Sequence, residues 1–458
     1  MEKSLVKGSP LKCIISFAVP VLFGLLFQQL YNMVDTVIVG HFLGLNPLAG
    51  VGSTSSLYFL VIGSCTGICG GFAIPVSQMY GANSLDELRR YVANGIWLSV
   101  GLAAILTTLT VSQCRNLLNL MNTPAQAYEY AYMYIVIIFA GIPTTFLYNI
   151  SSSIIRALGD SRSPVVFLVI SSIINIALDL LFILVLNMNV AGAALATVLS
   201  QLISGTICTV FMMRKFSVLR MTRDDWRPRI TLMRRLCAAG LPMGLQYSIT
   251  AIGSVSVQTA VNSFGEIAVA GVTAANKVYN ILCCPQDALG ATMATFAGQN
   301  IGAGRLDRVT KGLRAACITG FACSLLMLAV VLTSGRALAG IFLNANETQA
   351  LDYAQQFMRV TASGLMLLTI VNCFRFTIQG MGYSTFAMLA GVLEMIARCF
   401  VAFGLARWFG FSGVCFSNIC AWFAADCFLI PAFFSCRKRV SSMATFGVPR
   451  SWKRTDNL

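Results

Sequence analysis

Asp35 places a carboxylate in the middle of an apolar stretch, residues 14–42, whose other strongly polar side chains are Gln28, Gln29 and Asn32. A charged side chain at the centre of a bilayer costs roughly 2.5–3.5 kcal/mol on insertion scales. Such a residue usually faces a partner or a water-filled cavity, and it marks an ion or substrate path. Asp35 is therefore the first candidate for binding a cation.

A second acid in the same half of the chain, Asp179, follows Asn175 by four residues, so both side chains lie on one helix face. Carboxylate and amide oxygens suit Na⁺ or a shared proton, and the hydroxyls of Thr197 and Tyr134 can add to them. If Asp35 and Asp179 share a site, Na⁺ or H⁺ would relieve their repulsion, which is a physical basis for ion coupling. The alternative is an interfacial Asp179 held near the outer end of its helix.

Charged residues of the second half also stand in apolar surroundings: Lys277, Asp287, Arg375, Glu394, Arg398 and Asp426. Glu394 and Arg398 are four residues apart, so we expect them to form an ion pair. We expect Lys277 and Arg375 to pair with Asp287 or Asp426. Structural pairing is favoured over substrate contact for this group.

The elements that must hold these residues are long apolar helices. The chain of 458 residues is 57% hydrophobic and 11% charged, with a mean hydropathy of +0.76, whereas a soluble protein carries about 25% charged residues. Blocks of about 20 apolar residues in helical form span a bilayer core of about 30 Å. The sequence predicts an all-α membrane protein with twelve transmembrane helices, near 11–40, 50–79, 91–112, 127–150, 164–187, 190–213, 235–262, 268–299, 309–333, 352–377, 384–407 and 411–436.

The distribution of Lys and Arg predicts the orientation of these spans. Of the 32 basic residues, 25 fall in the stretches on one side, and only Arg115, Arg336 and Arg407 fall on the other. Because basic loops stay inside, both termini are expected in the cytoplasm of a multi-pass plasma (inner) membrane protein. The net charge of +15 then reflects membrane insertion, and no nucleic acid is expected as a partner.

The chain contains an internal repeat. The motif Gln78-x-x-Gly-Ala82 returns as Gln299-x-x-Gly-Ala303, and further pairs keep an offset of 221–223 residues, including Gly159 with Gly382. Six spans per repeat make the halves parallel, a common plan for secondary transporters. The predicted organisation is an amino-terminal six-helix lobe 1–213, a solvated cytoplasmic linker 214–234, a carboxy-terminal six-helix lobe 235–436 and a basic tail 437–458. Asp35 has no acidic counterpart in the second half, where Val257 or a neighbour takes its place.

Pro20 lies fifteen residues before Asp35 and can kink the first span because it removes a backbone hydrogen bond. A bend there could rearrange the helix when the charge of Asp35 changes, although a static packing kink explains a proline equally well. Polar and adaptable side chains form a set of candidate cavity-lining residues: Gln28, Asn32, Tyr31, Met33, Asn149, Gln246 and Arg375.

Several motifs together resemble the MATE (multidrug and toxic compound extrusion) family over residues 9–437. They are Pro20, Asn32-Met-Val-Asp-Thr36, Gly40, Gln78-x-x-Gly-Ala82, Arg156-Ala-Leu-Gly-Asp160, Asn175-x-x-x-Asp179 and Gln299-x-x-Gly-Ala303. The resemblance implies two pseudo-symmetric lobes around a central cavity. It also implies export of small amphipathic, often cationic organic compounds in exchange for Na⁺ or H⁺.

The same resemblance implies a cation-coupling site at Asp35, Asn175, Asp179 and Thr197, with Tyr134 nearby and Na⁺ as a candidate ligand. Many family members carry acids in the seventh and tenth spans. Residues 244–250 and 366–379 carry none here, which is similar to the DNA-damage-inducible branch that uses the amino-terminal site alone.

Two other functions compete with antiport. A lipid-linked oligosaccharide flippase of a related fold would tend to add spans and line its cavity with Arg. A membrane-embedded enzyme or sensor would need a convergent acid, base or metal set, and no Walker A, dinucleotide-binding or zinc-protease motif is visible. The chain is therefore not expected to be an enzyme or to use a cofactor. We expect a monomer in the lipid bilayer that transports small molecules.

Overall fold

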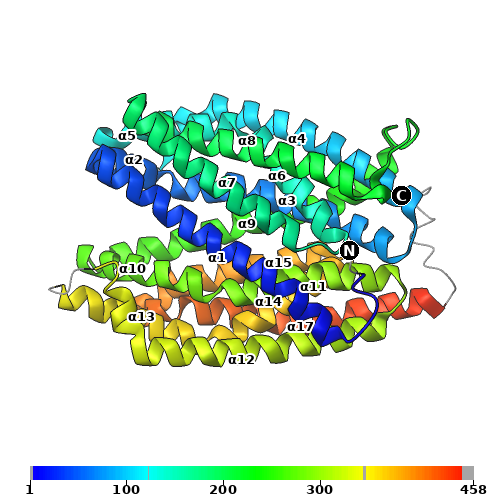
Figure 1. Cartoon of the computed structure of the whole chain (residues 1–458). Helices are drawn as coiled ribbons and strands as arrows, with labels where there is room; N and C mark the ends of the chain where they lie inside the picture. The colour runs from blue at the N-terminus through cyan, green and yellow to red at the C-terminus, as the bar shows by residue number, and fades with distance from the viewer. Residues whose placement is uncertain (1–3, 122, 344–346, 446–458) are drawn as a thin grey trace. The chain divides into compact units, whose positions relative to one another are not determined.

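The computed structural model describes residues 4–121, 123–343 and 347–445, and over these ranges the chain forms helices and no strand (Figure 1). By length and composition eight helices can cross a membrane, or eleven if each of three bent pairs counts as one span. The remaining long helix, α9 (Ile230–Asn262, 33 residues), stands where the seventh span was predicted. The expected all-α architecture is thus confirmed.

The chain divides into two compact units, and two helices pass from one to the other. The unit boundary in α1 (Pro10–Leu43) falls between Leu22 and Phe23, and that in α9 falls between Ser248 and Ile249. Each crossing follows a proline inside the helix, Pro20 in α1 and Pro242 in α9. The domain limits predicted from the sequence remain a prediction. In the structure, the first residues of α1, up to Leu22, belong to unit 2.

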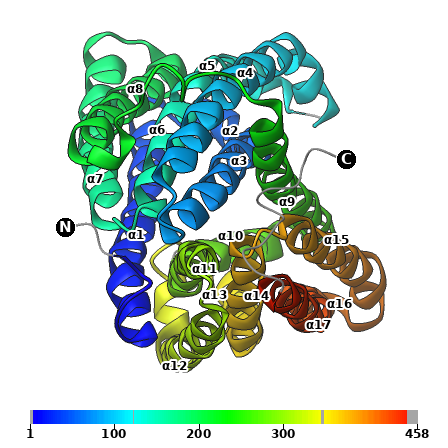
Figure 2. The same ribbon diagram turned by 90° about the vertical axis from the view of Figure 1, so that its right-hand side faces the viewer.

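Unit 1 contains residues 23–248, and its helices α3, α4 and α6 lie side by side (Figure 2). Its elements besides parts of α1 and α9 are α2 (Leu45–Ser53), α3 (Ser55–Gly81), α4 (Leu85–Leu120), α5 (Ala125–Ala140), α6 (Ile142–Ala157), α7 (Arg162–Leu180), a π-helical turn (Leu181–Val185), α8 (Asn189–Lys215) and a 3₁₀ turn (Ser217–Leu219).

Among the described residues, unit 2 contains 5–22, 249–343 and 347–445, and α11 packs on both α12 and α14 within it. Its elements besides parts of α1 and α9 are α10 (Glu266–Leu282), α11 (Cys284–Gly302), α12 (Leu306–Ala339), α13 (Thr348–Ser363), α14 (Leu365–Gly380), α15 (Ser384–Phe400), a π-helical turn (Val401–Leu405), α16 (Ala406–Cys415) and α17 (Ser417–Thr445).

The backbone repeats the internal symmetry of the sequence. Gly159 and Gly382, predicted as counterparts, both adopt a positive φ, 91° and 95°. This conformation is strained for residues with a Cβ, so glycine is required at both turns. A π-helical turn follows α7 in unit 1 and α15 in unit 2. The two halves therefore share local turn geometry as well as motifs.

The fourth span of each half is broken, which the hydropathy pattern did not predict. Helices α5 and α6 are bent by 48° at Gly141, and α13 and α14 by 50° at Gly364. A Cβ on Gly141 would lie 2.3 Å from Cγ2 of Val198, and one on Gly364 would lie 2.6 Å from Cγ1 of Ile419. Glycine at each break therefore admits the neighbouring helix, α8 in unit 1 and α17 in unit 2.

Close packing of α3 on α9 in unit 1 depends on Gly71. A Cβ there would lie 2.4 Å from Cα of Gly240, a backbone atom that cannot move without shifting its helix. We expect Gly71→Ala to destabilise the protein by about 1–3 kcal/mol, since overpacking forces backbone shifts. Thermal unfolding of the purified protein measures this loss. Gly101→Ala is the matched control, because a Cβ there meets nothing within 4 Å; equal melting temperatures for the two variants would contradict the prediction.

The segment before α1 is held by unit 2. Arg308 donates from Nη1 to the carbonyl of Gly8 (2.7 Å) and from Nη2 to that of Leu5 (3.2 Å). Gln299, the repeated glutamine of the second half, accepts a bond from Leu5 N (2.9 Å). In the second half, the glutamine of the repeat motif thus helps to hold the chain that leads into α1.

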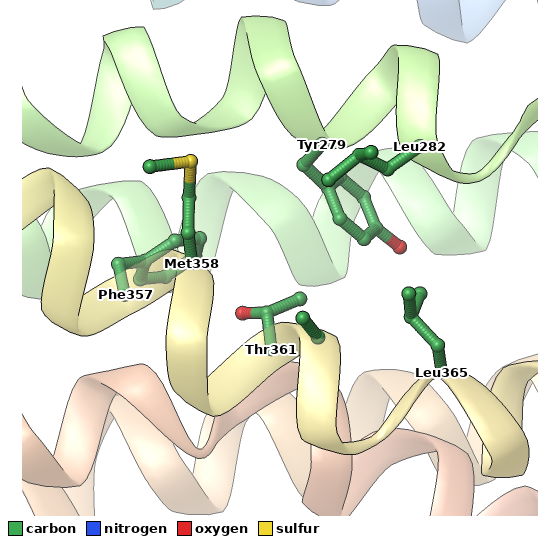
Figure 3. A pocket seen from close by; sticks show the side chains of 7 residues that line it. Tyr279, Leu282, Phe357, Met358, Thr361 and Leu365 are labelled. Carbon is green, nitrogen blue, oxygen red and sulfur yellow. The ribbon is translucent and has the colours of Figure 1, made fainter. Parts of the chain in front are cut away.

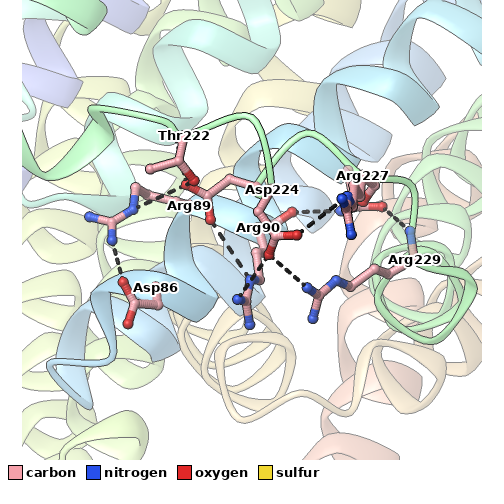
Figure 4. Close-up of polar contacts among 9 residues, drawn as sticks. Asp86, Arg89, Arg90, Thr222, Asp224, Arg227 and Arg229 are labelled. Atoms are coloured by element: carbon pink, nitrogen blue, oxygen red, sulfur yellow. Dashed lines mark hydrogen bonds and ion pairs between the residues drawn. The ribbon is translucent and has the colours of Figure 1, made fainter.

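The segment between α8 and α9 is held by unit 1 in a comparable way (Figure 4). Asp225 accepts hydrogen bonds from N and Oγ1 of Thr222 (2.8 and 2.9 Å) and lies 3.4 Å from Nε of Arg89. Asn94 Oδ1 accepts a bond from the backbone N–H of Arg229 (2.8 Å). The segment is therefore pinned to the start of α4, whereas the sequence favoured a solvated connector.

This attachment is expected to weaken in acid. Burial opposes ionisation of Asp225, but the hydrogen bonds from Thr222 and the charges of Arg89 and Arg90 outweigh it and hold its pKa below the ordinary value. Because the pKa of Asp225 is lower in the folded than in the unfolded protein, its ionised carboxylate stabilises the fold. This stabilisation is complete at pH values above the unfolded-state pKa of about 3.9, and it is lost as the pH falls through the folded-state pKa.

Limited proteolysis of the segment 216–229 at a series of pH values measures this effect. Cleavage should accelerate below about pH 4 in the wild type, and Asp225→Asn should cleave rapidly at every pH. Asp307→Asn, which alters an exposed acid of unit 2, serves as the control. Cleavage of the wild type that does not change with pH would contradict the prediction.

Candidate functional site

The two acids predicted to cooperate lie together in unit 1. Asp35 of α1 lies beside Asp179 of α7, close enough for the two carboxyl groups to interact. Asp179 is fully buried, and Oδ1 of Asp35 is buried without a hydrogen-bond partner among the described residues. The helices approach closely because Gly24 on α1 has no side chain: a Cβ there would lie 3.0 Å from Cγ2 of Val165 on α7.

Neutral oxygen ligands flank this acid pair. Asn175, one turn below Asp179 on α7, donates from Nδ2 to Oγ1 of Thr197 on α8 (3.4 Å). The hydroxyl of Thr197 donates to the carbonyl of Ala193 (3.1 Å), and Tyr31 of α1 lies beside it. Asn175 uses its nitrogen in this bond, so its amide oxygen is the atom suited to a cation.

Tyrosines from two further helices complete the surroundings. Tyr134 of α5 interacts electrostatically with both Asp35 and Asp179, and Tyr58 of α3 interacts with Asp35. Tyr134 was predicted, and it is buried. Tyr58 was not predicted, because a single tyrosine in an apolar helix has no distinguishing pattern. Its position beside Asp35 depends on how α3 packs in unit 1.

Two neighbouring carboxylates repel each other in a buried site, and a proton on one of them relieves this repulsion. This arrangement is chemically suited to one shared proton, or to a small cation between the carboxyl oxygens. Carboxyl, amide and hydroxyl oxygens are hard ligands, which suit Na⁺. No cluster of three or more His, Cys, Asp or Glu that could hold a transition metal occurs among the described residues.

The other predicted cavity residues are dispersed. Gln28 and Asn32 of α1 are exposed and Met33 is half-buried. Asn149 donates to the carbonyl of Thr145 (2.9 Å) within α6. Gln246 is buried in α9, in the part that belongs to unit 1. Contact of these residues with a substrate stays a prediction.

The predicted charge pairs of unit 2 are only partly correct. Glu394 lies 3.9 Å from Arg398, as expected. Arg375 forms its close ion pair with Glu394, not with Asp287 or Asp426. The expectation for Lys277 was also wrong, since its side chain is exposed on α10. Helix spacing identified the contact within α15, whereas the contact between α14 and α15 depends on tertiary packing.

A small apolar pocket between α10 and the bent pair α13–α14 lies beside Tyr279, Met358 and Leu365 (Figure 3). Its volume is about 10 Å³, about the size needed for one water. It is a packing gap at the bend and cannot admit an organic molecule.

Repeated helical units, apolar spans and a buried acid pair in one unit define a polytopic membrane protein built like a secondary transporter. The MatE family model matches residues 20–181 and 242–403, one match in each repeat. The chain therefore belongs to the MatE family, as the sequence motifs predicted. Members of this family are transporters, so the protein is a multi-pass membrane transporter and not an enzyme.

Relatives and solved structures agree with this assignment. The chain is 30% identical over 307 residues to "Probable multidrug resistance protein YpnP" of Bacillus subtilis (strain 168), which covers 66% of this chain and 68% of the relative. It is 25% identical over 385 residues to "DNA damage-inducible protein F" of Escherichia coli (strain K12), covering 81% and 80%.

The fold resembles a structure titled "Outward-facing conformation of a multidrug resistance MATE family transporter of the MOP superfamily". The TM-score is 0.89 at 22% identity, and the match covers 96% of this chain and 98% of the other. A second structure, "Crystal structure of MATE in complex with MaL6", matches with a TM-score of 0.88 at 22% identity over 96% and 99%. The predicted fold of twelve helices in two six-helix lobes is thereby confirmed.

Proposed function

We propose that the protein is a multidrug efflux antiporter that exports small amphipathic, often cationic organic compounds in exchange for Na⁺ or H⁺. The observation that carries this proposal is the pair of neighbouring acids in unit 1, Asp35 and Asp179. A buried acid pair can exchange its shared proton for a monovalent cation without changing its net charge. Several relatives are named as multidrug resistance or multidrug export proteins, and these names support organic compounds as the substrate class.

The coupling ion acts in this scheme at the oxygens of Asp35, Asp179, Asn175 and Thr197, with Tyr134 and Tyr58 beside them. A change in the charge of this acid pair alters the interaction between α1 and α7. Because α1 passes between the units two residues after Pro20, a change at Asp35 is transmitted along one continuous helix. Substrate release and ion binding are thereby linked through α1.

The protein acts, in this proposal, in the plasma membrane as a monomer with both termini in the cytoplasm. The strong bias of Lys and Arg to one set of loops supports that orientation. The buried arginines do not support the alternative function, a lipid-linked oligosaccharide flippase. The buried arginines Arg375 and Arg398 that it would use for an anionic headgroup both lie against Glu394.

The decisive experiment uses proteoliposomes in which a Na⁺ gradient or a pH gradient is imposed separately. Efflux of a fluorescent organic cation driven by one gradient and not by the other identifies the ion. Efflux driven by neither gradient, in protein shown to be folded by thermal unfolding, would contradict antiport.

A further inference from the structure

Asp426 on α17 is a buried acid that the proposed ion site in unit 1 does not use. The residue is only 4% exposed, and both of its carboxyl oxygens are buried without a hydrogen-bond partner among the described residues. It forms no ion pair with any basic residue in that part of the chain. A buried polar group without a partner is costly, and its retention in a packed interior calls for an explanation.

Charged and titratable groups face Asp426 from the helices packed against α17. Helix α14 contributes Arg375, α15 contributes Glu394, and α12 contributes Cys317. Arg398, also on α15, lies against the same glutamate. These side chains form a buried charged cluster within unit 2, and Asp426 is the member without a direct partner.

The charge balance of this cluster depends on the state of Asp426. Arg375 and Arg398 carry two positive charges, and Glu394 carries one negative charge. Asp287 supplies the second negative charge, since it accepts a hydrogen bond from Asn372 (2.9 Å) and interacts with Arg375. With Asp287 counted, these groups are neutral in sum when Asp426 is a carboxylic acid and carry a net negative charge when Asp426 is ionised. An uncompensated buried charge is far more costly than a neutral acid.

The ligand that balances this charge is a proton and not a metal cation. Two guanidinium groups lie in the same cluster, and they repel Na⁺ at any oxygen of Asp426. A proton is transferred to one carboxylate oxygen and needs no coordination shell.

We propose that Asp426 is a second proton-binding site, which takes up and releases one proton in unit 2. The step is the addition of H⁺ from water to the carboxylate, giving the carboxylic acid, and its reversal. Proton binding at Asp426 is independent of the proposed function. Its use in coupling rests on that function.

Infrared difference spectroscopy of the purified full-length protein in lipid nanodiscs, titrated with pH, tests the proposal. The stretching band of protonated carboxyl groups disappears as each acid loses its proton. We expect Asp426→Asn to lack one such band of the wild type. Asp35→Asn should retain that band and lack a different one, so the two sites are separated in one experiment.

Identical carboxyl bands in Asp426→Asn and the wild type would overturn the proposal. Should Asp426→Asn fail to fold, Asp426→Glu decides: a shifted band supports proton binding at this position, and an unshifted one contradicts it. Loss of gradient-driven transport in Asp35→Asn tests the proposed function alone and leaves this result unaffected. Thermal unfolding of Asp426→Asn adds a second readout. If Asp426 were a fixed ionic partner of Arg375, its removal would lower the melting temperature at every pH. If Asp426 is a proton-binding site, its removal should leave the melting temperature nearly unchanged in acid.

Discussion

Asp35→Asn is expected to abolish ion-gradient-driven efflux while leaving the protein folded. Asparagine has nearly the shape of aspartic acid, and it can donate a hydrogen bond to Asp179, as a protonated carboxyl does. It cannot release a proton or bind Na⁺ with a negative charge. The coupling free energy is then lost, which in coupled systems is typically 1–3 kcal/mol and corresponds to roughly 5–150-fold in equilibrium affinity.

Proteoliposomes with an imposed Na⁺ or pH gradient provide the measurement, with initial rates of substrate transport compared at equal protein content. Glu129→Gln is a matched control, because it removes an exposed acid from α5 of the same unit. Full gradient-driven transport by Asp35→Asn would show that the acid pair does not couple the ion. A parallel loss in Glu129→Gln would point to a general effect of charge on the assay.

Glu394→Gln is expected to cause the largest loss of stability among single changes in unit 2. Glu394 is 3% exposed, forms a close ion pair with Arg375 and lies 3.9 Å from Arg398. Removing it leaves two buried guanidinium groups with too little negative charge. Breaking a buried ion pair in this way costs about 3–5 kcal/mol, and the melting temperature in detergent measures the loss.

The double variant Glu394→Gln with Arg375→Met should recover part of that stability, because it removes one of the uncompensated charges. Asp352→Asn is the control. It breaks the Arg336–Asp352 pair (2.5 Å), whose side chains are 47% and 64% exposed, and such a pair contributes about 0–1 kcal/mol. If Glu394→Gln lowered the melting temperature no more than Asp352→Asn, the cluster would not be held together by its charges.

The two units use the same backbone plan for different electrostatics. Unit 1 brings two acids into contact and surrounds them with neutral oxygens, which favours an exchangeable cation. Unit 2 places fixed guanidinium groups of Arg375 and Arg398 among its acids. The repeat therefore explains the shared turns, such as those at Gly159 and Gly382, whereas the charges of each unit set its ion chemistry.

Much of the site was predictable because its residues are local in sequence or unusual in type. Asp35 stands out in an apolar span, and Asn175 and Asp179 share a helix face through their spacing of four. The expected closeness of Asp35 and Asp179 is what the structure shows. The contact of Tyr31 with Thr197, the position of Tyr58 and the pairing of Arg375 with Glu394 were not predicted. Each of these joins helices that are distant in sequence.

By itself, the sequence determined the all-α membrane class, the repeat, the family and one candidate ion site. These follow from hydropathy, residue spacing and motif identity, which are properties of single helices or of one turn. Only the tertiary structure decided where α1 and α9 change unit, where the fourth span of each half breaks, and which charges pair in unit 2. The physical reason is that close approach at glycines and pairing between buried charges are free energies of contact between helices. The order of residues along any one helix does not specify them.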